Sequence, residues 1–224
     1  MAHFLEGGRL GLSLEELRLE YKRGKLDEAN CDSNPIEQFR RWITDARSAE
    51  LLEPNAMTLS TATTDGRPSG RIVLLKELTS EEFIFYTNYT SRKGREMEAN
   101  PFVSLTFYWA ELERQVRVEG RVRRVSREKS EAYFRSRPKG SRLGALASHQ
   151  STPLPSRVPL EQTLAELEAR YRDSDDVPTP GWWGGYAVRP DTLEFWQGRP
   201  NRLHDRIVYS RMRETGWTVG RLSP

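Results

Sequence analysis

The sequence predicts a mainly β protein with peripheral helices, an α+β fold built on a small β-barrel. At least six short strand-like segments follow one another closely, and segments with helical spacing are grouped between them. The chain shows no βαβ alternation and no phosphate loop of the G-x-G-x-x-G type. These two observations argue against a doubly wound nucleotide-binding fold.

The composition favours a folded chain with a polar surface. Of the 224 residues, 36% are hydrophobic and 10% aromatic, and the mean hydropathy is −0.73. Thirty-five basic residues nearly balance 32 acidic ones, which argues against disorder. The net charge of +3 is too small to imply a nucleic-acid partner by itself.

The chemistry-bearing residues predict a metal-free, cytoplasmic protein. The single cysteine, Cys31, excludes an internal disulfide and suits a reducing compartment. Three widely separated histidines, His3, His149 and His204, provide no metal-ligand spacing. The N-terminus lacks the apolar run of a signal peptide, and the longest aliphatic run, residues 72–75, is too short for a membrane span.

The sequence predicts that the chain is divided into two units. Residues 1–33 form an N-terminal arm with a short helix, because Ser13-Leu14-Glu15-Glu16 is a capping box. Residues 34–224 form the main domain. Its first helix starts at Asn34-Pro35, a favourable N-cap and N1 pair, and carries an apolar face spaced for a helix.

Strands dominate after this helix. An Asp65-Gly66 turn between residues 57–63 and 69–78 predicts a hairpin. The remaining segments follow from alternation, caps and prolines: strands at 83–88, 102–109 and 114–125, a helix at 91–100, two helices within 128–148, a helix around Leu160 to Tyr171, and strands from Trp183 to the C-terminus.

Near the C-terminus, Trp196 is followed by Arg202-Leu203-His204-Asp205-Arg206. If this stretch is extended, alternation places Arg202, His204 and Arg206 on one face. Two guanidiniums beside an imidazole and an indole could bind a phosphate together with a flat heteroaromatic ring. A solvated basic strand with a structural tryptophan is the alternative.

Several other groups predict anion binding. Arg92 and Lys93 fall in the first turn of a helix, where free N–H groups and the helix dipole favour a phosphate. Tyr133 and Arg137, four apart, could converge with Ser141 on one anion. Gln115 and Gln150-Ser151 could read the edge of a heterocycle. Ordinary caps and solvated strand ends would explain each group taken singly.

Taken together, these segments resemble the pyridoxamine (pyridoxine) 5′-phosphate oxidase family. The similar segments occur in family order from about residue 35 to the C-terminus. They are Arg71-Ile72-Val73-Leu74-Leu75-Lys76, Phe85-Tyr86-Thr87-Asn88, Ser91-Arg92-Lys93, Glu113-Arg114-Gln115-Val116, Tyr133 through Pro138, Gln150-Ser151, Trp183-Gly184-Gly185, Phe195-Trp196-Gln197-Gly198 and Arg202 through Arg206.

This resemblance implies an FMN-binding split β-barrel that acts as a homodimer, with two sites at the subunit interface. The implied FMN contacts are Arg71, Ile72, Val73, Leu74, Leu75, Lys76, Tyr86, Thr87, Arg92, Lys93, Gln115, Gln150, Ser151, Trp196 and Arg206. The implied substrate contacts are Lys76, Tyr133, Arg137, Ser141, Arg202, Leu203 and His204, with Arg18 and Tyr21 of the N-terminal arm as a lid. Arg202 and His204 would be the catalytic residues.

The implied reaction oxidises pyridoxamine 5′-phosphate or pyridoxine 5′-phosphate to pyridoxal 5′-phosphate and reduces O2 to H2O2, a step of vitamin B6 metabolism. Two alternatives belong to other classes. A carrier on the same barrel would bind FMN or pyridoxal phosphate without catalysis. A nucleic-acid binder would use the arginines between Arg117 and Arg127. Neither a membrane nor a nucleic acid is an expected partner of the oxidase.

Overall fold

The computed structural model describes residues 20–212 and 216–224. In this part of the chain, nine antiparallel strands form one curled sheet. The strands are β1 (Ala56–Ala62), β2 (Pro68–Leu74), β3 (Glu77–Leu78), β4 (Phe83–Asn88), β5 (Phe102–Trp109), β6 (Arg114–Arg124), β7 (Trp183–Gln197), β8 (Asp205–Met212) and β9 (Gly216–Arg221).

Five α-helices and three short 3-10 helices surround the sheet in the same part of the chain. They are α1 (Pro35–Ser48), α2 (Arg92–Ala99), α3 (Arg127–Ser136), α4 (Lys139–Ala147), α5 (Val158–Arg170), η2 (Glu28–Asn30), η3 (Ala110–Leu112) and η4 (Pro200–Arg202). The mainly β, split-barrel class predicted from the sequence is therefore confirmed.

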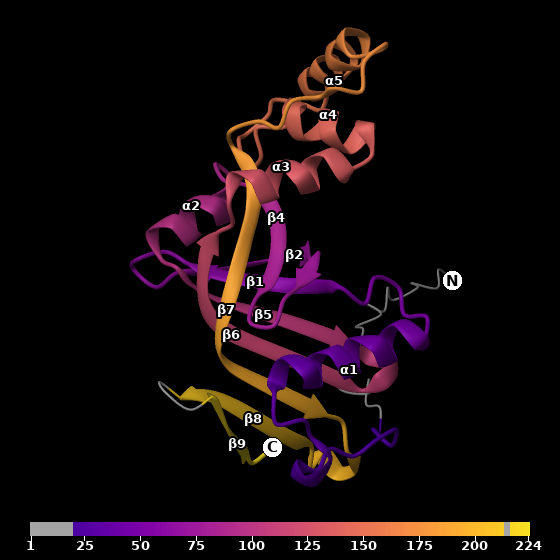
Figure 1. The fold of residues 1–224 in the computed structure, drawn as a ribbon, viewed down its shortest axis with the longest axis vertical. Helices are drawn as coiled ribbons and strands as arrows, with labels where there is room; N and C mark the ends of the chain where they lie inside the picture. The colour runs from indigo at the N-terminus through magenta and orange to yellow at the C-terminus, as the bar shows by residue number, and fades with distance from the viewer. Residues whose placement is uncertain (1–19, 213–215) are drawn as a thin grey trace, which may run out of the picture.

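The long strand β7 is where the sheet divides. One edge of β7 pairs with β6 along most of its length. Its other edge pairs with β4 over Trp183–Val188 and then with β8 over Thr192–Gln197. Figure 1 shows β7 running from the helical end of the molecule to the opposite end. The strand thus connects two regions that the rest of the sheet keeps apart.

A proline and a glycine make this division possible. Pro190 lies between the two stretches of β7 that pair with β4 and β8, where it interrupts no ladder on that edge. On the β6 side the register shifts between Glu119 and Gly120. A Cβ at Gly120 would lie 2.1 Å from the Arg189 carbonyl oxygen, so this close approach of backbones requires glycine.

Helix α1 covers the inner face of the barrel. Asn34 accepts a hydrogen bond from the Ile36 N–H, and Pro35 occupies the first turn. The helix buries Phe39 and Trp42 against the sheet. The Phe39 ring lies 5.0 Å from the Phe83 ring and 4.8 Å from the Phe107 ring, measured between centroids. These aromatic contacts form the centre of the main core.

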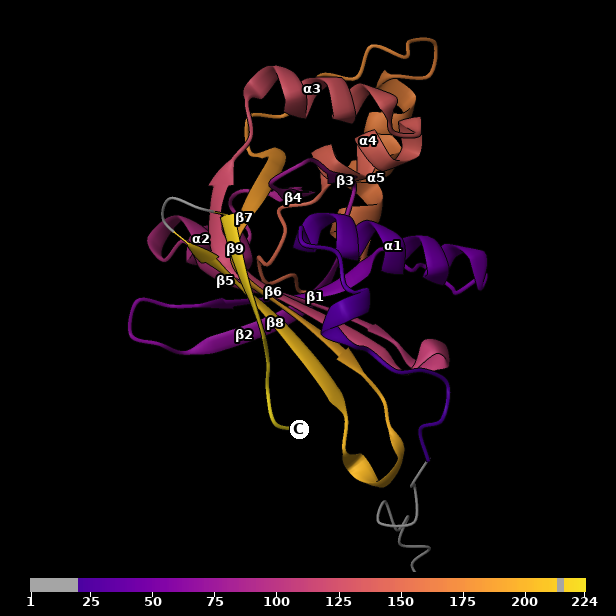
Figure 2. The same ribbon diagram turned by 60° about the horizontal axis from the view of Figure 1, so that its bottom comes forward.

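A second, smaller core lies under α3, α4 and α5. Phe134, Leu143, Val177 and Trp183 are its buried members. Figures 1 and 2 both place these three helices together at the end of the molecule opposite to η4. Trp183 is also the first residue of β7, so it joins the helical layer to the sheet.

Most sequence predictions for single elements are confirmed. Strands β1 and β2 form the hairpin around Gly66, which has a φ of +84°. Two helices occupy the segment from Arg127 to Ala147. The single strand predicted for residues 69–78 is wrong, because β2 ends at Leu74 and β3 begins at Glu77. The predicted N-terminal helix lies almost wholly outside the described residues.

The prediction of one extended stretch from Arg202 to Arg206 is also wrong. Arg202 ends the 3-10 helix η4 and has a φ of +61°, and β8 begins only at Asp205. Pro200 starts this turn and restricts the backbone at that point. Arg202, His204 and Arg206 therefore do not share one strand face.

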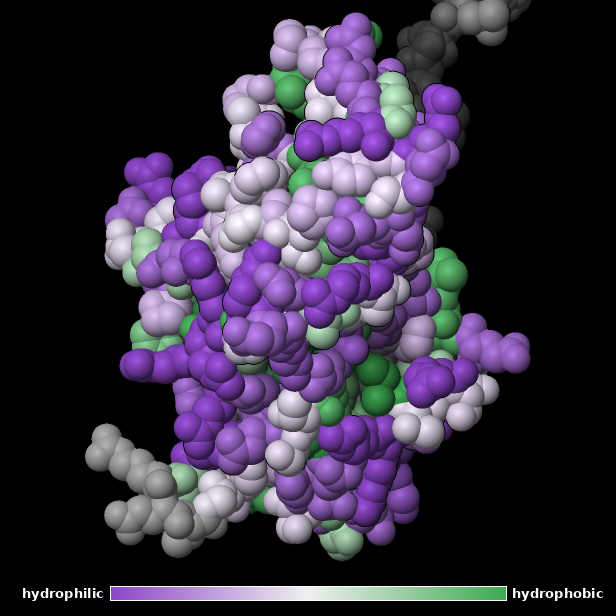
Figure 3. All heavy atoms as spheres, turned by 45° about the horizontal axis from the view of Figure 1, so that its top comes forward, coloured by the Kyte–Doolittle hydropathy of each residue, from purple (hydrophilic) through white to green (hydrophobic). Residues whose placement is uncertain are grey.

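The surface of the described residues is largely polar. Figure 3 shows hydrophilic side chains over most of the viewed face, with hydrophobic residues in separate patches. Among the described helices, none combines the length and apolar character needed to cross a bilayer.

We expect Phe39→Ala to lower the free energy of unfolding by about 3–5 kcal/mol, because it removes a fully buried ring at the centre of the main core. Denaturant unfolding followed by circular dichroism measures this change. Leu52→Ala is the matched control, since the Leu52 side chain is 95% exposed. Equal effects of the two substitutions would contradict the placement of the core.

Candidate functional site

A cavity of about 420 Å³ opens between β2, β4 and the start of β7. Its lining contains four cationic side chains and no carboxylate. The lining residues are Arg71, Ile72, Val73, Leu74, Lys76, Tyr86, Thr87, Lys93, Tyr133, Arg137, Gln150 and Trp183. Eleven of the twelve are site residues predicted from the sequence. We call this space the cationic cavity.

A second hollow of about 390 Å³ adjoins the cationic cavity. The two share Tyr86, Thr87, Arg137, Gln150 and Trp183. The second hollow adds Ser141 from α4, so the three groups Tyr133, Arg137 and Ser141 lie around one continuous space. Their predicted convergence is consistent with this arrangement, although Arg137 follows α3 in an extended conformation rather than continuing it.

Lys93 is a buried ammonium without a carboxylate partner in the described chain. It lies in the first turn of α2, and its Nζ donates to Gln150 Oε1 at 2.7 Å. Two hydroxyl oxygens, Thr87 Oγ1 and Ser91 Oγ, are each 3.4 Å away. Burial, together with the neighbouring Arg71 charge, lowers the pKa of Lys93 to about 8.

Arg137 carries an unsatisfied donor. Its guanidinium lies 4.8 Å from the centre of the Trp183 ring. Its Nη1 is buried and has no hydrogen-bond partner among the described residues. Burial lowers the pKa of Arg137, with a further contribution from the charge of Arg142. A buried guanidinium N–H without a partner is an expensive arrangement that an anionic ligand would satisfy.

Three aromatic rings form a stack beside these cations. The Tyr86 and Tyr133 rings lie 3.9 Å apart with an interplanar angle of 17°. The Trp183 ring lies 5.5 Å from Tyr86 at 13°. Gly185 allows this packing, since a Cβ there would lie 2.8 Å from Tyr86 Cε1. The stack provides flat apolar surface next to the cationic groups of the cavity. The family resemblance includes Trp183 but implies no role for it.

Arg71 is held rigidly at the edge of the cavity. Its Nη1 donates to the Leu59 carbonyl and to Thr61 Oγ1, and its Nη2 donates to Ser69 Oγ and Glu96 Oε2. Glu96 is a residue that sequence reasoning missed. Its spacing of four from Arg92 on a helix was the available signal, and the Arg92 Nε does donate to Glu96 Oε1 at 2.8 Å.

A second cluster of predicted site residues lies near the C-terminal end of β7. Gln115, Trp196 and Arg206 are register partners across β6, β7 and β8. The Trp196 ring lies 4.6 Å from the His204 ring, and the Tyr21 ring lies 5.6 Å from both. Arg206 donates to both carboxylate oxygens of the buried Glu194. We call this group the C-terminal cluster.

The surroundings of His204 in this cluster favour the neutral form of its imidazole. Its Nδ1 accepts a hydrogen bond from the Arg199 backbone N–H at 3.1 Å. Burial and the charge of Arg202 lower the pKa of His204, and Asp205 opposes them. Arg202 and Asn201 both have positive φ values, a strained backbone that is often found at functional sites. Leu203 is exposed beside them.

The cationic cavity and the C-terminal cluster lie apart in the described chain. No residue of the cluster lines the cationic cavity or the hollow beside it. Figure 1 shows α3 and β4 in the upper part of the view and the end of β7 at the bottom.

Three predicted site residues lie in neither the cationic cavity nor the C-terminal cluster, and a fourth lies outside the described residues. Leu75 is buried in the core, Arg92 pairs with Glu96 outside the cavity, and Ser151 lies in an exposed turn. Arg18 lies outside the described residues.

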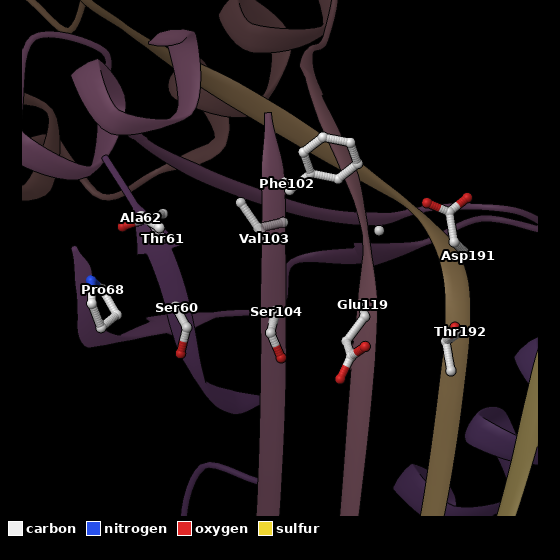
Figure 4. A pocket seen from close by; sticks show the side chains of 11 residues that line it. Ser60, Thr61, Ala62, Pro68, Phe102, Val103, Ser104, Glu119, Asp191 and Thr192 are labelled. Atoms are coloured by element: carbon white, nitrogen blue, oxygen red, sulfur yellow. The ribbon is translucent and has the colours of Figure 1, made fainter. Parts of the chain in front are cut away.

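A further hollow of about 430 Å³ lies on the open face of the sheet, which is the face that α1 does not cover. Figure 4 shows Ser60, Ser104, Glu119 and Thr192 projecting from β1, β5, β6 and β7. This hollow has no cationic side chain in its lining and includes two carboxylates, Glu119 and Asp191. It therefore lacks the chemistry of an anion site, unlike the cationic cavity.

Comparison with known families agrees with this geometry. Residues 43–171 match the family model described as pyridoxamine 5′-phosphate oxidase. Residues 183–224 match the model described as pyridoxine 5′-phosphate oxidase C-terminal dimerisation region. The chain belongs to the pyridoxamine 5′-phosphate oxidase family. As a member of this family, it is an oxidoreductase.

Curated family members are similar over nearly their whole length. A pyridoxine/pyridoxamine 5′-phosphate oxidase of Rubrobacter xylanophilus is 58% identical over 219 residues, covering 98% of this chain and 99% of that protein. The oxidase of the same name from Burkholderia multivorans is 56% identical over 214 residues, covering 95% and 99% respectively.

Solved structures confirm the fold. PhzG from Burkholderia lata, in complex with tetrahydrophenazine-1-carboxylic acid, superposes with a TM-score of 0.83 at 33% identity and covers 88% of this chain and 95% of its own. A pyridoxamine 5′-phosphate oxidase-related, FMN binding protein from Nostoc punctiforme has a TM-score of 0.68 at 17% identity, covering 83% and 97%.

We expect Arg202→Ala to raise the pKa of His204, because burial and the Arg202 charge are the two influences that lower it. Asp205→Asn should move the pKa in the opposite direction. Titration of the His204 ring protons by NMR, assigned with a His204→Gln variant, measures both shifts. Equal pKa values in the wild type and Arg202→Ala would contradict the proximity of these two charges.

Proposed function

We propose that this family member is an FMN-dependent oxidase that converts pyridoxamine 5′-phosphate or pyridoxine 5′-phosphate to pyridoxal 5′-phosphate. The observation that carries this proposal is the cationic cavity. Four cations line it without a carboxylate, the buried Lys93 forms no ion pair within the described chain, and Arg137 has an unsatisfied buried N–H. Phosphate groups would supply the missing negative charge.

The donor set fits two phosphates, one on the flavin and one on the substrate. Arg71 and Lys93 lie at the α2 end of the cavity, where they would hold the FMN phosphate. Arg137, Tyr133 and Ser141 lie around the adjoining space, where they would hold the substrate phosphate with Lys76. The parallel aromatic rings between them suit planar heteroaromatic groups.

The protein's own contribution is to bind, orient and place charge. FMN, when bound, would accept two electrons from the substrate and pass them to O2, giving H2O2. Pyridoxine phosphate would lose two hydrogens; pyridoxamine phosphate would also take up water and release ammonia. Remote phosphate binding would fix the position of the reacting carbon. Arg202 and a neutral His204 would orient the pyridine ring and stabilise developing charge.

The separation of the two clusters supports a homodimer with shared sites. Gln115, Trp196 and Arg206 lie on the open face of the sheet, because their neighbours Val116, Phe195 and Ile207 are buried on the other face. This face also exposes large apolar side chains. They are Ile72, Phe102, Tyr108 and Met212. A second protomer covering the face would bring its C-terminal cluster to the cationic cavity.

The alternatives have weaker support. A carrier would have no need for the Arg202–His204 pair. The arginines between Arg117 and Arg127 are largely engaged within the protein, since Arg117, Arg123, Arg124 and Arg127 each pair with a glutamate. The curated oxidases are also more similar in sequence to this chain than PhzG is, at 52–58% against 33% identity.

Anaerobic reduction of the FMN-loaded protein tests the reaction. We expect the yellow colour to bleach on addition of pyridoxine 5′-phosphate and to return in air as pyridoxal phosphate and peroxide form. The visible spectrum follows both steps, and pyridoxine without phosphate is the matched control. Yellow protein that stays oxidised would favour the carrier, and failure to bind FMN would overturn the proposal.

Complementation tests the shared site. Lys93→Ala damages the cationic cavity and Arg202→Ala damages the C-terminal cluster. After subunit exchange, half of the dimers would contain one chain of each kind and one intact site, so activity should return to about a quarter of wild type. A mixture of Arg202→Ala with His204→Ala should recover nothing. Equal activity of the two mixtures would contradict a site shared between protomers.

A further inference from the structure

Glu96 joins three elements behind the wall of the cationic cavity. Its side chain is 6% exposed and does not line the cavity. Glu96 Oε2 accepts from Thr61 Oγ1 of β1 at 2.5 Å and from Ser69 Oγ of β2 at 2.6 Å. The same oxygen accepts from Arg71 Nη2 at 3.3 Å. Glu96 is therefore the buried carboxylate next to the cavity's cations.

The hydroxyls of Thr61 and Ser69 connect Glu96 to Arg71 through hydrogen bonds. Each hydroxyl donates to Glu96 and accepts from the Arg71 guanidinium. All four N–H groups on Nη1 and Nη2 of Arg71 are thereby directed at protein oxygens. The guanidinium is fixed in one orientation before a ligand arrives, so its ordering cost is met on folding rather than on binding.

Glu96 also offsets repulsion among the cations. Burial opposes ionisation of Glu96, but hydrogen bonds from Ser69, Thr61 and Arg92 lower its pKa to about 2. Its negative charge favours the protonated form of Lys93, against burial and the charge of Arg71. Glu96 thus partly offsets the two influences that lower the pKa of Lys93.

Neutral oxygens, other cations and two tyrosines surround Lys93. Thr87 and Gln150 are neutral, and Arg71, Arg137 and Lys76 are cations of the same cavity. Burial raises the pKa of Tyr86 to about 12 and also raises the pKa of Tyr133. With its pKa lowered to about 8, Lys93 changes its charge near that pH.

We propose that Glu96 is a positioning residue for the flavin phosphate: it fixes the Arg71 guanidinium in one orientation at the edge of the cavity. The inference rests on the proposed function, since it concerns the same FMN site. It assigns to a residue outside the cavity a part of the affinity for the phosphate, and none of the affinity for the flavin ring.

The test compares FMN with riboflavin, which lacks the phosphate. Dissociation constants are measured with the apo-protein by flavin fluorescence at pH 7.0 and pH 8.8, where the FMN phosphate is mainly a dianion. The wild type should prefer FMN at both values and lose part of this preference at the higher pH. Glu96→Gln should bind FMN more weakly than the wild type at both values, because the Arg71 guanidinium loses its anchor. The additional loss between the two pH values should be about fivefold for a pKa of Lys93 one unit lower.

Glu98→Gln is the matched control. Glu98 lies on the same helix and accepts from Arg124 and Tyr186, outside the cavity lining. It should follow the wild type at both pH values, and riboflavin affinity should be equal in all three proteins. Equal FMN affinity in Glu96→Gln and the wild type at both pH values would overturn the role of Glu96. A wild type that binds FMN no better than riboflavin would instead overturn the proposed phosphate site.

Ser69→Ala provides a second variant if Glu96→Gln does not fold, as judged by circular dichroism. It removes one hydrogen bond to Glu96 and one from Arg71 while leaving both charges in place. We expect roughly a fivefold loss of FMN affinity at pH 7.0 with unchanged riboflavin affinity. An unchanged FMN affinity in this variant would contradict the anchoring of Arg71.

Discussion

The concentration of positive charge around one cavity is the constraint on which the rest of the structure depends. Like charges in a partly buried space repel one another and lose hydration, so the fold must compensate for both effects. It does so with neutral oxygens from Gln150, Thr87 and Ser91 around Lys93, and with one carboxylate set behind the wall. No carboxylate intrudes into the cavity lining itself, which leaves the cations available to an anionic ligand.

The split sheet provides the framework for this arrangement. One part of β7 pairs with β4 and carries Trp183 into the cavity, and the other part pairs with β8 and carries Trp196 away from it. The bend between them depends on Pro190 and on the close approach at Gly120. A single long strand thus distributes two groups of candidate site residues to separate ends of the described chain.

Local patterns explain how much of this could be predicted from the sequence. The cap at Asn34, the turn at Gly66 and the prolines bounding the helices act over a few residues, so they predicted the elements correctly. The cations of the cavity were identified as well, because their residue types and order match a family pattern. The break at Leu75 was missed, since an apolar run gives no sign of where pairing changes from β1 to β4.

The remaining differences have longer-range causes. Alternation predicted one strand through Arg202, but the turn begun by Pro200 takes precedence there. Glu96 was missed because its partners Thr61 and Ser69 come from strands distant in the sequence, and only folding brings them together. The separation of the C-terminal cluster from the cavity likewise follows from sheet topology, which periodicity does not encode.

The hydrogen bonding of Arg71 has a consequence for which residues can occupy that position. With both terminal nitrogens already donating to Leu59, Thr61, Ser69 and Glu96, the side chain acts on a ligand chiefly through its fixed positive field. A lysine would preserve the charge but has three donors on one nitrogen, too few to reach four separated acceptors. Substitution at this position is therefore restricted by shape rather than by charge, and arginine is the side chain that meets the restriction.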